Sequence, residues 1–239
     1  MTRIATLPVL AAVLAAAVLA PTACKPVDLT TPATTGPAGP ATPATPPPAN
    51  AAALLRKLPV AEEDTGAHYE RAEWGEDWPA RTDGCTTRDL VLLRQAKGAQ
   101  RGAGCALHCP AAKPCWVSPY DGRATADPGE LEIDHRVPLN EAARSRVVAG
   151  GKPGLGATRV WSAAQKHAYY ADPANLVAVT AEVNSAKSDD DPARWRPANR
   201  EAWCAYATRY IQTKLKYHLT ADKAERAALA QMLGTCPAK

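Results

Sequence analysis

The pattern of apolar and polar residues in the middle of the chain predicts two strands and a short helix. Residues 131–139, "LEIDHRVPL", have the pattern of a strand that ends near a proline. Residues 175–180, "NLVAVT", alternate and are β-branched, which favours a second strand. Residues 181–188, "AEVNSAKS", contain helix formers after Thr180 as N-cap, and this helix must end by Pro192. The predicted order is strand, long connection, strand, short helix.

The long connection, from Asn140 to about Ala171, has two features of its own. Residues 149–159, "AGGKPGLGATR", are rich in glycine and predict a loop. Residues 162–172, "SAAQKHAYYAD", predict a short helical stretch.

Two helices are predicted near the C-terminal end. In residues 199–217, helical spacing relates four side chains: Trp203, Tyr206, Tyr210 and Lys214. A second helix is expected over about 221–233, with Thr220 as N-cap and Gly234 as its stop. Because the connection between them is short, the two helices should be antiparallel.

The N-terminal residues predict export. Residues 1–24 hold one early arginine and then an apolar run with small residues toward its end, which is typical of a signal peptide. One interpretation is cleavage before Cys24 with a lipid anchor at that cysteine; the alternative is ordinary cleavage and a freely secreted protein. Residues 25–53 are rich in Pro, Thr and Ala and predict an extended tether. The folded domain is then expected over 54–239, with no transmembrane span in the mature protein.

The cysteines predict disulfides. Of the seven, six remain if Cys24 is lipidated: Cys85, Cys105, Cys109, Cys115, Cys204 and Cys236. An even set in an exported chain favours disulfides, although six cysteines permit 15 connectivities. Cys204 lies near the start of the first C-terminal helix and Cys236 just past the end of the second, so antiparallel helices bring them together. Cys85 then pairs within the group 105/109/115.

That group of three cysteines, with His108 inside it, also permits a zinc site. Its x3 and x5 spacings lack the usual two-residue knuckle, and export favours oxidation over thiolate ligation. Disulfides are therefore the preferred interpretation.

Charge narrows the choice of function only slightly. The net charge is +4, and it becomes +3 when Arg3, Lys25 and Asp28 are removed from the 28 basic and 24 acidic residues. This balance is compatible with a polyanionic ligand but does not demand one. The sequence contains no Gly-rich phosphate loop, no Gly-x-Ser-x-Gly and no His-Glu-x-x-His, which excludes those common chemistries.

A carboxylate, an imidazole and a carboxamide are expected to meet on this strand–strand–helix unit. Asp134 and His135 lie on the first strand and Asn184 lies on the helix. Two hard oxygen donors suit Mg²⁺, and a neutral histidine with a pKa of about 6.5 suits a general base. Together they fit metal-assisted phosphodiester hydrolysis. Since adjacent strand residues point to opposite faces, Asp134 and His135 converge only if the strand twists, bulges or ends near Pro138.

Three segments carry a family resemblance: "IDHRVPL" (133–139), "DPANLVAV" (172–179) and "NSAKSDDDPARW" (184–195). Together they resemble the HNH endonuclease superfamily with its ββα-metal core, and most closely the C-terminal domain of GmrSD-type restriction endonucleases and exported proteins that share it. The resemblance implies the following roles: Asp134 and Asn184 bind the metal, His135 activates water, Asn175 braces the loop between the strands, and Lys187 approaches the scissile phosphate.

The resemblance extends over roughly Tyr69 to Cys236. It includes "DGCTTRDLVLLRQ" (83–95), "SPYDGR" (118–123) and both C-terminal helices. The sequence departs from the family at "QKHAYY" (165–170), where the family has an arginine and a phenylalanine.

Several of these residues have structural alternatives. Asn175 is interpreted as structural more than catalytic, and Lys187 either contacts phosphate or lies on a solvated helix face. Glu132, on the same strand face as Asp134, could support the metal ligands. His167 is either a ligand or a half-exposed helix residue. The remaining groups have simpler interpretations: Trp161, Trp195 and Trp203 pack rather than stack on bases, and Asp189–Asp191 form a solvated loop.

The prediction is an α+β domain with a ββα-metal (HNH) core over 130–195, added helices and disulfide staples. It is expected to be an exported monomer that cleaves DNA, with RNA as the alternative substrate, using Mg²⁺ or else Mn²⁺. Two other hypotheses are a non-catalytic cell-surface binding protein on the same scaffold and a secreted nuclease toxin.

Overall fold

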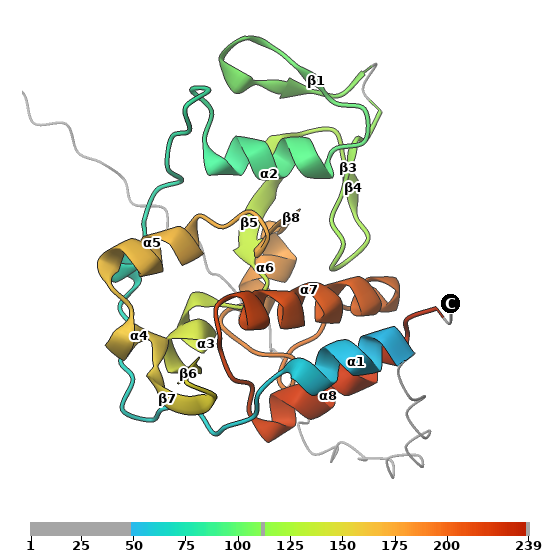
Figure 1. The fold of residues 1–239 in the computed structure, drawn as a ribbon. Helices are drawn as coiled ribbons and strands as arrows, with labels where there is room; N and C mark the ends of the chain where they lie inside the picture. Colours follow the sequence, from blue (N-terminus) through green and yellow to red (C-terminus); the bar gives the residue numbers. More distant parts are fainter. Residues whose placement is uncertain (1–48, 111–112, 238–239) are drawn as a thin grey trace, which may run out of the picture. The chain divides into compact units, whose positions relative to one another are not determined.

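Helix α1 (Ala49–Lys57) is the first element of the computed structural model, which describes residues 49–110 and 113–237 (Figure 1). The predicted signal peptide, Cys24 and most of the tether lie outside these residues. Structure begins before the boundary predicted at residue 54, because Ala51 and Leu55 bury one face of α1 in the core. The alanines at the start of α1 belong to the stretch that the sequence predicted as tether. They form a helix there because alanine is the best helix former.

Strands β5 (Leu131–His135) and β8 (Leu176–Thr180) form the predicted antiparallel pair. They pair from Leu131 opposite Thr180 to His135 opposite Leu176 without a bulge. Helix α6 (Ala181–Lys187) follows β8 directly and packs against both strands (Figure 1). Thr180 occupies the predicted N-cap position, but its hydroxyl donates to the Asp121 carboxylate (2.5 Å) and makes no cap bond.

Every residue of β8 is buried, although its sequence alternates. Helix α2 (Thr87–Gln95) packs against this strand. At the end of α2, the Gln95 carboxamide accepts from the Ala178 N–H (2.9 Å) and donates to the Ala178 carbonyl (2.7 Å). The side chain therefore takes the place of a neighbouring strand at the free edge of β8.

The long connection between β5 and β8 is more ordered than its glycines suggest. It contains α3 (Leu139–Arg144), β6 (Arg146–Ala149), β7 (Lys152–Gly156), α4 (Ala157–Val160) and α5 (Ala163–Tyr170). The stretch predicted as a glycine-rich loop is a β6–β7 hairpin. Gly150 and Gly151 form its turn with φ of 58° and 77°, a conformation that two-residue hairpin turns require and glycine adopts without strain.

The C-terminal helices match the predicted arrangement except at one cap. A short 3₁₀ turn, η5 (Arg200–Ala202), leads into α7 (Trp203–Lys216), and α8 (Lys223–Leu233) packs against α7 with α1 alongside both (Figure 1). Helix α8 is capped by Asp222, in a capping box with Glu225, and not by Thr220. The Thr220 hydroxyl instead accepts the backbone N–H of Arg146 (3.1 Å), so it is used by the tertiary structure.

Three disulfides link the six cysteines of the described residues: Cys204–Cys236, Cys85–Cys105 and Cys109–Cys115. The first is the predicted staple between α7 and the end of α8. The other two leave no thiolate in the 105/109/115 group, so the zinc alternative is wrong. Short elements surround these bridges: β1 (Gln100–Arg101), β2 (Leu107–His108), β3 (Trp116–Val117), β4 (Ala124–Thr125) and the 3₁₀ turns η1 (Arg71–Glu73), η2 (Ala103–Cys105) and η4 (Pro128–Glu130).

The fold is thus a mixed helix-and-strand domain with two apolar clusters. The larger cluster joins α1, α7 and α8 to the aromatic residues of α5, and the smaller one lies between α2 and the β5–β8 pair. Within the larger cluster, the fully buried Lys214 ammonium contacts the carboxyl oxygens of Glu141 and Glu225, both at 2.6 Å. None of the described helices combines the length and apolar character that a membrane span requires.

Candidate active site

Asp134 and His135 both line one cavity of about 470 Å³, together with Asn184. No bulge brings them together, since the β5–β8 register is unbroken through Asp134 and His135; His135 is the last residue of β5. The cavity is completed by side chains from η1, α3 and the end of α6, among them Arg71, Asn140 and Asp189.

The Asp134 carboxylate is buried and held at both oxygens. Its Oδ1 accepts from the Lys187 ammonium (2.8 Å), and its Oδ2 accepts from the Tyr120 hydroxyl (2.7 Å). Burial, together with the charge on Asp134, raises the pKa of Tyr120 well above its usual value, so Tyr120 remains a donor. These two contacts fix the direction in which the carboxylate faces the cavity.

Lys187 takes neither of its two predicted positions. Its side chain is fully buried and its ammonium donates to Asp134 and to the His135 carbonyl (2.9 Å). The solvated helix face is therefore wrong, and a direct contact with substrate phosphate does not fit this arrangement. The Asn-x-x-Lys spacing places Asn184 and Lys187 one helical turn apart, but only Asn184 reaches the cavity.

His135 is oriented by a carbonyl and by two aromatic rings. Its Nε2 lies 2.8 Å from the Tyr170 carbonyl oxygen, which can only accept, so Nε2 carries the proton and Nδ1 holds the free lone pair. The imidazole stacks on Trp78 (5.8 Å between centroids, 26° between planes) and tilts against Tyr170. Burial lowers the pKa of His135 to about 3, and the charges of Arg71 and Lys187 act in the same direction. The ring is therefore neutral near pH 7, but it is a much weaker base than the pKa of about 6.5 expected from the sequence would make it.

Asn175 braces the chain just after His135. It is fully buried, its Oδ1 accepts from the Val137 N–H (2.9 Å) and its Nδ2 donates to the Val137 carbonyl (3.0 Å). The Asn175 carbonyl also accepts from the Arg136 N–H (2.8 Å). This set of contacts matches the brace expected from the sequence and leaves no group of Asn175 facing the cavity.

Asn184 is turned by Glu132, which the sequence placed on the face of Asp134. Its Nδ2 donates to the Glu132 carboxylate (2.7 Å), so the amide oxygen points away from that contact. Among the described residues, no three His, Cys, Asp or Glu side chains converge as a metal site. A hard cation that takes few protein ligands and fills its shell with water and phosphate suits the two oxygens of Asp134 and Asn184. These are the hard oxygen donors that Mg²⁺ prefers, and both oxygens of Asp134 also accept hydrogen bonds from Lys187 and Tyr120.

The sequence did not predict the partners that surround these residues. Tyr120, Trp78 and Tyr170 hold Asp134 and His135, yet they lie on three other segments of the chain. The only sequence signal was "SPYDGR", a segment of the family resemblance that contains Tyr120. Asp189 is exposed, as the solvated loop requires, and it also lines the cavity and accepts a hydrogen bond from Asn140. Asp191 is buried and its carboxylate accepts from the Ala193 N–H, so the solvated interpretation is wrong for that residue.

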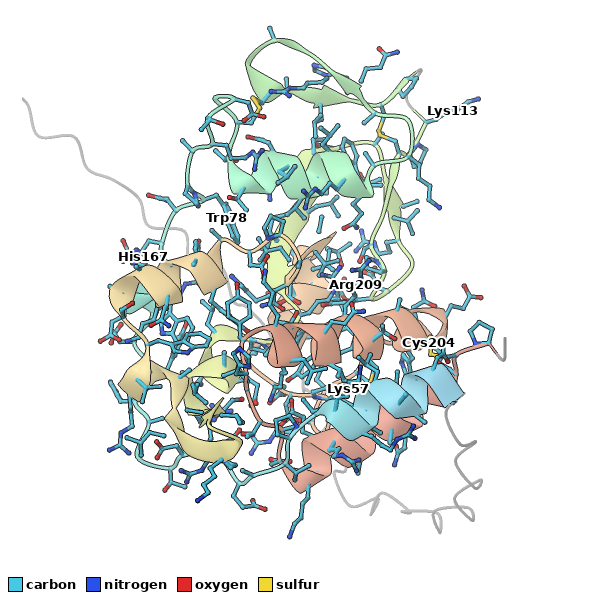
Figure 2. All side chains as sticks on the ribbon, in the orientation of Figure 1. Lys57, Trp78, Lys113, His167, Cys204 and Arg209 are labelled. Carbon is cyan, nitrogen blue, oxygen red and sulfur yellow. A yellow bond between two sulfur atoms is a disulfide. The ribbon has the colours of Figure 1, made fainter. Side chains whose placement is uncertain are left out.

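The remaining candidates lie away from the cavity. His167 is exposed on α5 (Figure 2) and does not line the cavity. The three tryptophans weighed for base stacking, Trp161, Trp195 and Trp203, are each packed against the larger apolar cluster, as their structural alternative expects.

Comparison with known proteins connects this geometry to a family. A family model described as "GmrSD restriction endonucleases, C-terminal domain" matches residues 113–232, which include all the cavity residues from β5 and α6. An "Uncharacterized secreted protein" from Arthroderma benhamiae is 33% identical over 190 residues, covering 79% of this chain and 85% of that protein. No solved structure matches the chain. The secreted relative and the three disulfides are consistent with an extracytoplasmic location.

Proposed function

The chain belongs to the family of the C-terminal domain of GmrSD restriction endonucleases, and from this premise we propose that it is an exported endonuclease that hydrolyses phosphodiester bonds in DNA. One observation carries the proposal. A neutral imidazole of fixed tautomer shares a polar cavity with a carboxylate and a carboxamide, all three placed by a β5–β8–α6 unit. We interpret this unit as the ββα-metal core of HNH nucleases.

His135 acts as the general base. Because Nε2–H is committed to the Tyr170 carbonyl, the lone pair on Nδ1 is the group that takes a proton from water. The stacked Trp78 and Tyr170 rings prevent the imidazole from rotating away. Arg71, an exposed cation that lines the same cavity, attracts the negatively charged phosphodiester.

Asp134 and Asn184 would hold a single divalent ion, Mg²⁺ or alternatively Mn²⁺. When bound, such an ion stabilises the charge that develops on the phosphoryl and leaving oxygens. Lys187 and Tyr120 position Asp134, while Glu132 positions Asn184. Asn175 and Lys187 thus act on the reaction through the residues that they hold.

Further properties belong to the same proposal. The protein acts outside the cytoplasm as a monomer, with DNA favoured over RNA, and Cys24 is the site of a lipid anchor if the signal is cleaved before it. A non-catalytic surface binding protein and a toxin with a cognate inhibitor are the rival hypotheses.

The test is nicking of supercoiled plasmid by the exported chain, purified with its disulfides formed, in Mg²⁺, Mn²⁺ or EDTA. His135→Ala should abolish nicking, because it removes the group that takes the proton from water. His167→Ala is the matched control, since the same substitution is made at an exposed histidine outside the cavity. Metal-dependent nicking that survives in the control and disappears in His135→Ala supports the proposal. A folded wild type that binds DNA but leaves every plasmid and single strand intact favours the binding-protein hypothesis.

A further inference from the structure

A second groove lies between α2 and α7, apart from the candidate active site. It has a volume of about 650 Å³ and is lined by α2, by residues 172–174 and Leu176, and by Arg81, Arg136 and Arg209. Figure 2 shows Arg209 on the side of α7 that faces α2. The two cavities share no lining residue: His135 lines the active-site cavity and Arg136, the next residue, lines this groove.

The groove is strongly cationic. Its charged lining residues are four arginines and one acid, namely Arg81, Arg94, Arg136, Arg209 and Asp172. The Asp172 carboxylate is already neutralised, because it accepts from the Lys216 ammonium (2.7 Å) and from the Tyr217 hydroxyl (3.1 Å). It therefore does not balance the arginines.

Three of these arginines have no carboxylate within 4.0 Å in the part of the chain that the structure describes: Arg94, Arg136 and Arg209. Arg94 and Arg209 are exposed. Arg136 is half-buried and its orientation is set by the carbonyls of Leu176 (2.7 Å) and Ala174 (3.3 Å). Arg81 makes only an exposed contact with Asp83 (3.5 Å). Like charges that share a groove repel one another, and a bound polyanion would relieve this repulsion.

We propose that this groove is a second nucleic-acid site, which binds the phosphodiester backbone of the substrate away from the scissile phosphate. The inference rests on the proposed function for the identity of the ligand. All cations lining the groove are arginines, whose planar guanidinium groups bind phosphate through paired N–H donors. Such contacts hold and orient a polymer without reading its sequence.

The test compares two double variants of equal charge. Arg94→Ala with Arg209→Ala removes the two exposed cations of the groove. Arg56→Ala with Lys57→Ala removes two exposed cations from α1, which contributes no residue to the groove; Figure 2 shows Lys57 on this helix, across α7 from α2. Each is made in the full exported chain, in a His135→Ala background with EDTA for binding and in the wild-type background for hydrolysis.

Binding of a fluorescently labelled DNA duplex and single strand is measured by anisotropy over a series of salt concentrations. Each lost phosphate contact lowers the slope of log Kd against log salt by about 0.9, so the groove variant should lose about two units. Its Kd near physiological salt should rise about tenfold, while the α1 variant keeps both values. Both variants should hydrolyse bis(p-nitrophenyl) phosphate as the wild type does, because this small diester needs only the active-site cavity.

Three results would overturn the inference: equal loss of affinity in both variants, no loss in the groove variant, or tight groove-dependent binding of heparin with none of DNA. These outcomes are separate from failure of the proposed function. Groove-dependent DNA binding without any hydrolysis would refute the nuclease and leave the groove site standing. Normal hydrolysis with no effect of the groove variant would refute the groove site alone.

Discussion

Substitution of Lys187 by methionine tests the central contact of the candidate site. Methionine is of similar length and apolar, so it removes the ammonium with little change in packing. In the native chain, the ammonium lies 2.8 Å from Asp134 Oδ1 and 2.9 Å from the His135 carbonyl, with side-chain exposures of 0% for Lys187 and 6% for Asp134. Solvent therefore screens this pair very little.

Removing one partner of a buried ion pair costs about 3–5 kcal/mol, because it leaves the other charge buried without compensation. Since domains are stable by about 5–15 kcal/mol, this is a large fraction of the free energy of unfolding. At about 2–4 °C per kcal/mol for a domain of this size, the melting temperature of Lys187→Met should fall by about 10 °C. Lys152→Met, at an exposed position of β7, should change it by no more than about 1–2 °C.

The assay is thermal and urea unfolding in EDTA, followed by the same measurement in Mg²⁺. The double variant Asp134→Asn with Lys187→Met removes both charges and should be destabilised by less than the sum of the single variants. A divalent ion at Asp134 would supply the missing positive charge, so Mg²⁺ should raise the melting temperature of Lys187→Met more than that of wild type. If Lys187→Met unfolds at the wild-type temperature in EDTA, the buried pair does not exist and the side chain is solvated.

Three further predictions concern stability. Asn175→Ala should lower the free energy of unfolding by about 1–3 kcal/mol in urea titrations, because it leaves the Val137 N–H buried without a partner, while the Val137 carbonyl keeps its bond from the Tyr169 hydroxyl; retention of full stability would contradict its role as a brace. Burial raises the pKa of Glu225 from 4.5 to about 8. The native state therefore keeps a proton that the unfolded chain releases, so this group's contribution is complete below pH 4.5 and is lost as pH rises to about 8; Glu225→Gln should flatten that decline, and an unchanged pH profile would refute it. Replacing Cys204 and Cys236 by serine should lower the free energy of unfolding by about 3–4 kcal/mol, because the bridge closes a loop of 32 residues. The measurement is calorimetry, and a loss below about 1 kcal/mol would show that the bridge adds little stability.

Local sequence was sufficient for the elements that bear the site. The β-branched residues of β8 favour a strand and the helix formers of α6 favour a helix, and the fold gives each stretch the secondary structure that it favours. Strand, strand and helix therefore appear in the predicted order. The Cys204–Cys236 bridge followed from helix lengths and a short connection alone. The sequence predicted Thr220 as the N-cap of α8, whereas the fold uses Asp222. Both residue types are good N-caps, and only the contact between Thr220 and Arg146 distinguishes them.

Residue types that occur close together along the chain also indicated the reactive groups. Asp134 and His135 are neighbours, and Asn184 lies on the helix that follows the paired strand, so a motif could name all three. Glu132 could be assigned to the face of Asp134 from strand alternation, but its hydrogen bond to Asn184 appears only in the fold. The glycine-rich segment near Gly150 was predicted as a loop because hairpin strands as short as β6 and β7 have too few residues to show alternation.

Sequence by itself determined which chemical groups this protein carries, the order of its central elements and one of its disulfides, because each depends on neighbours within a few residues or on a simple length. Tertiary structure alone decided how those groups are held. Lys187 is buried against Asp134, Tyr170 fixes the tautomer of His135, and arginines from α2 and α7 line one groove. Burial and pairing depend on which distant segments pack together, and that information is not contained in any short stretch of the chain.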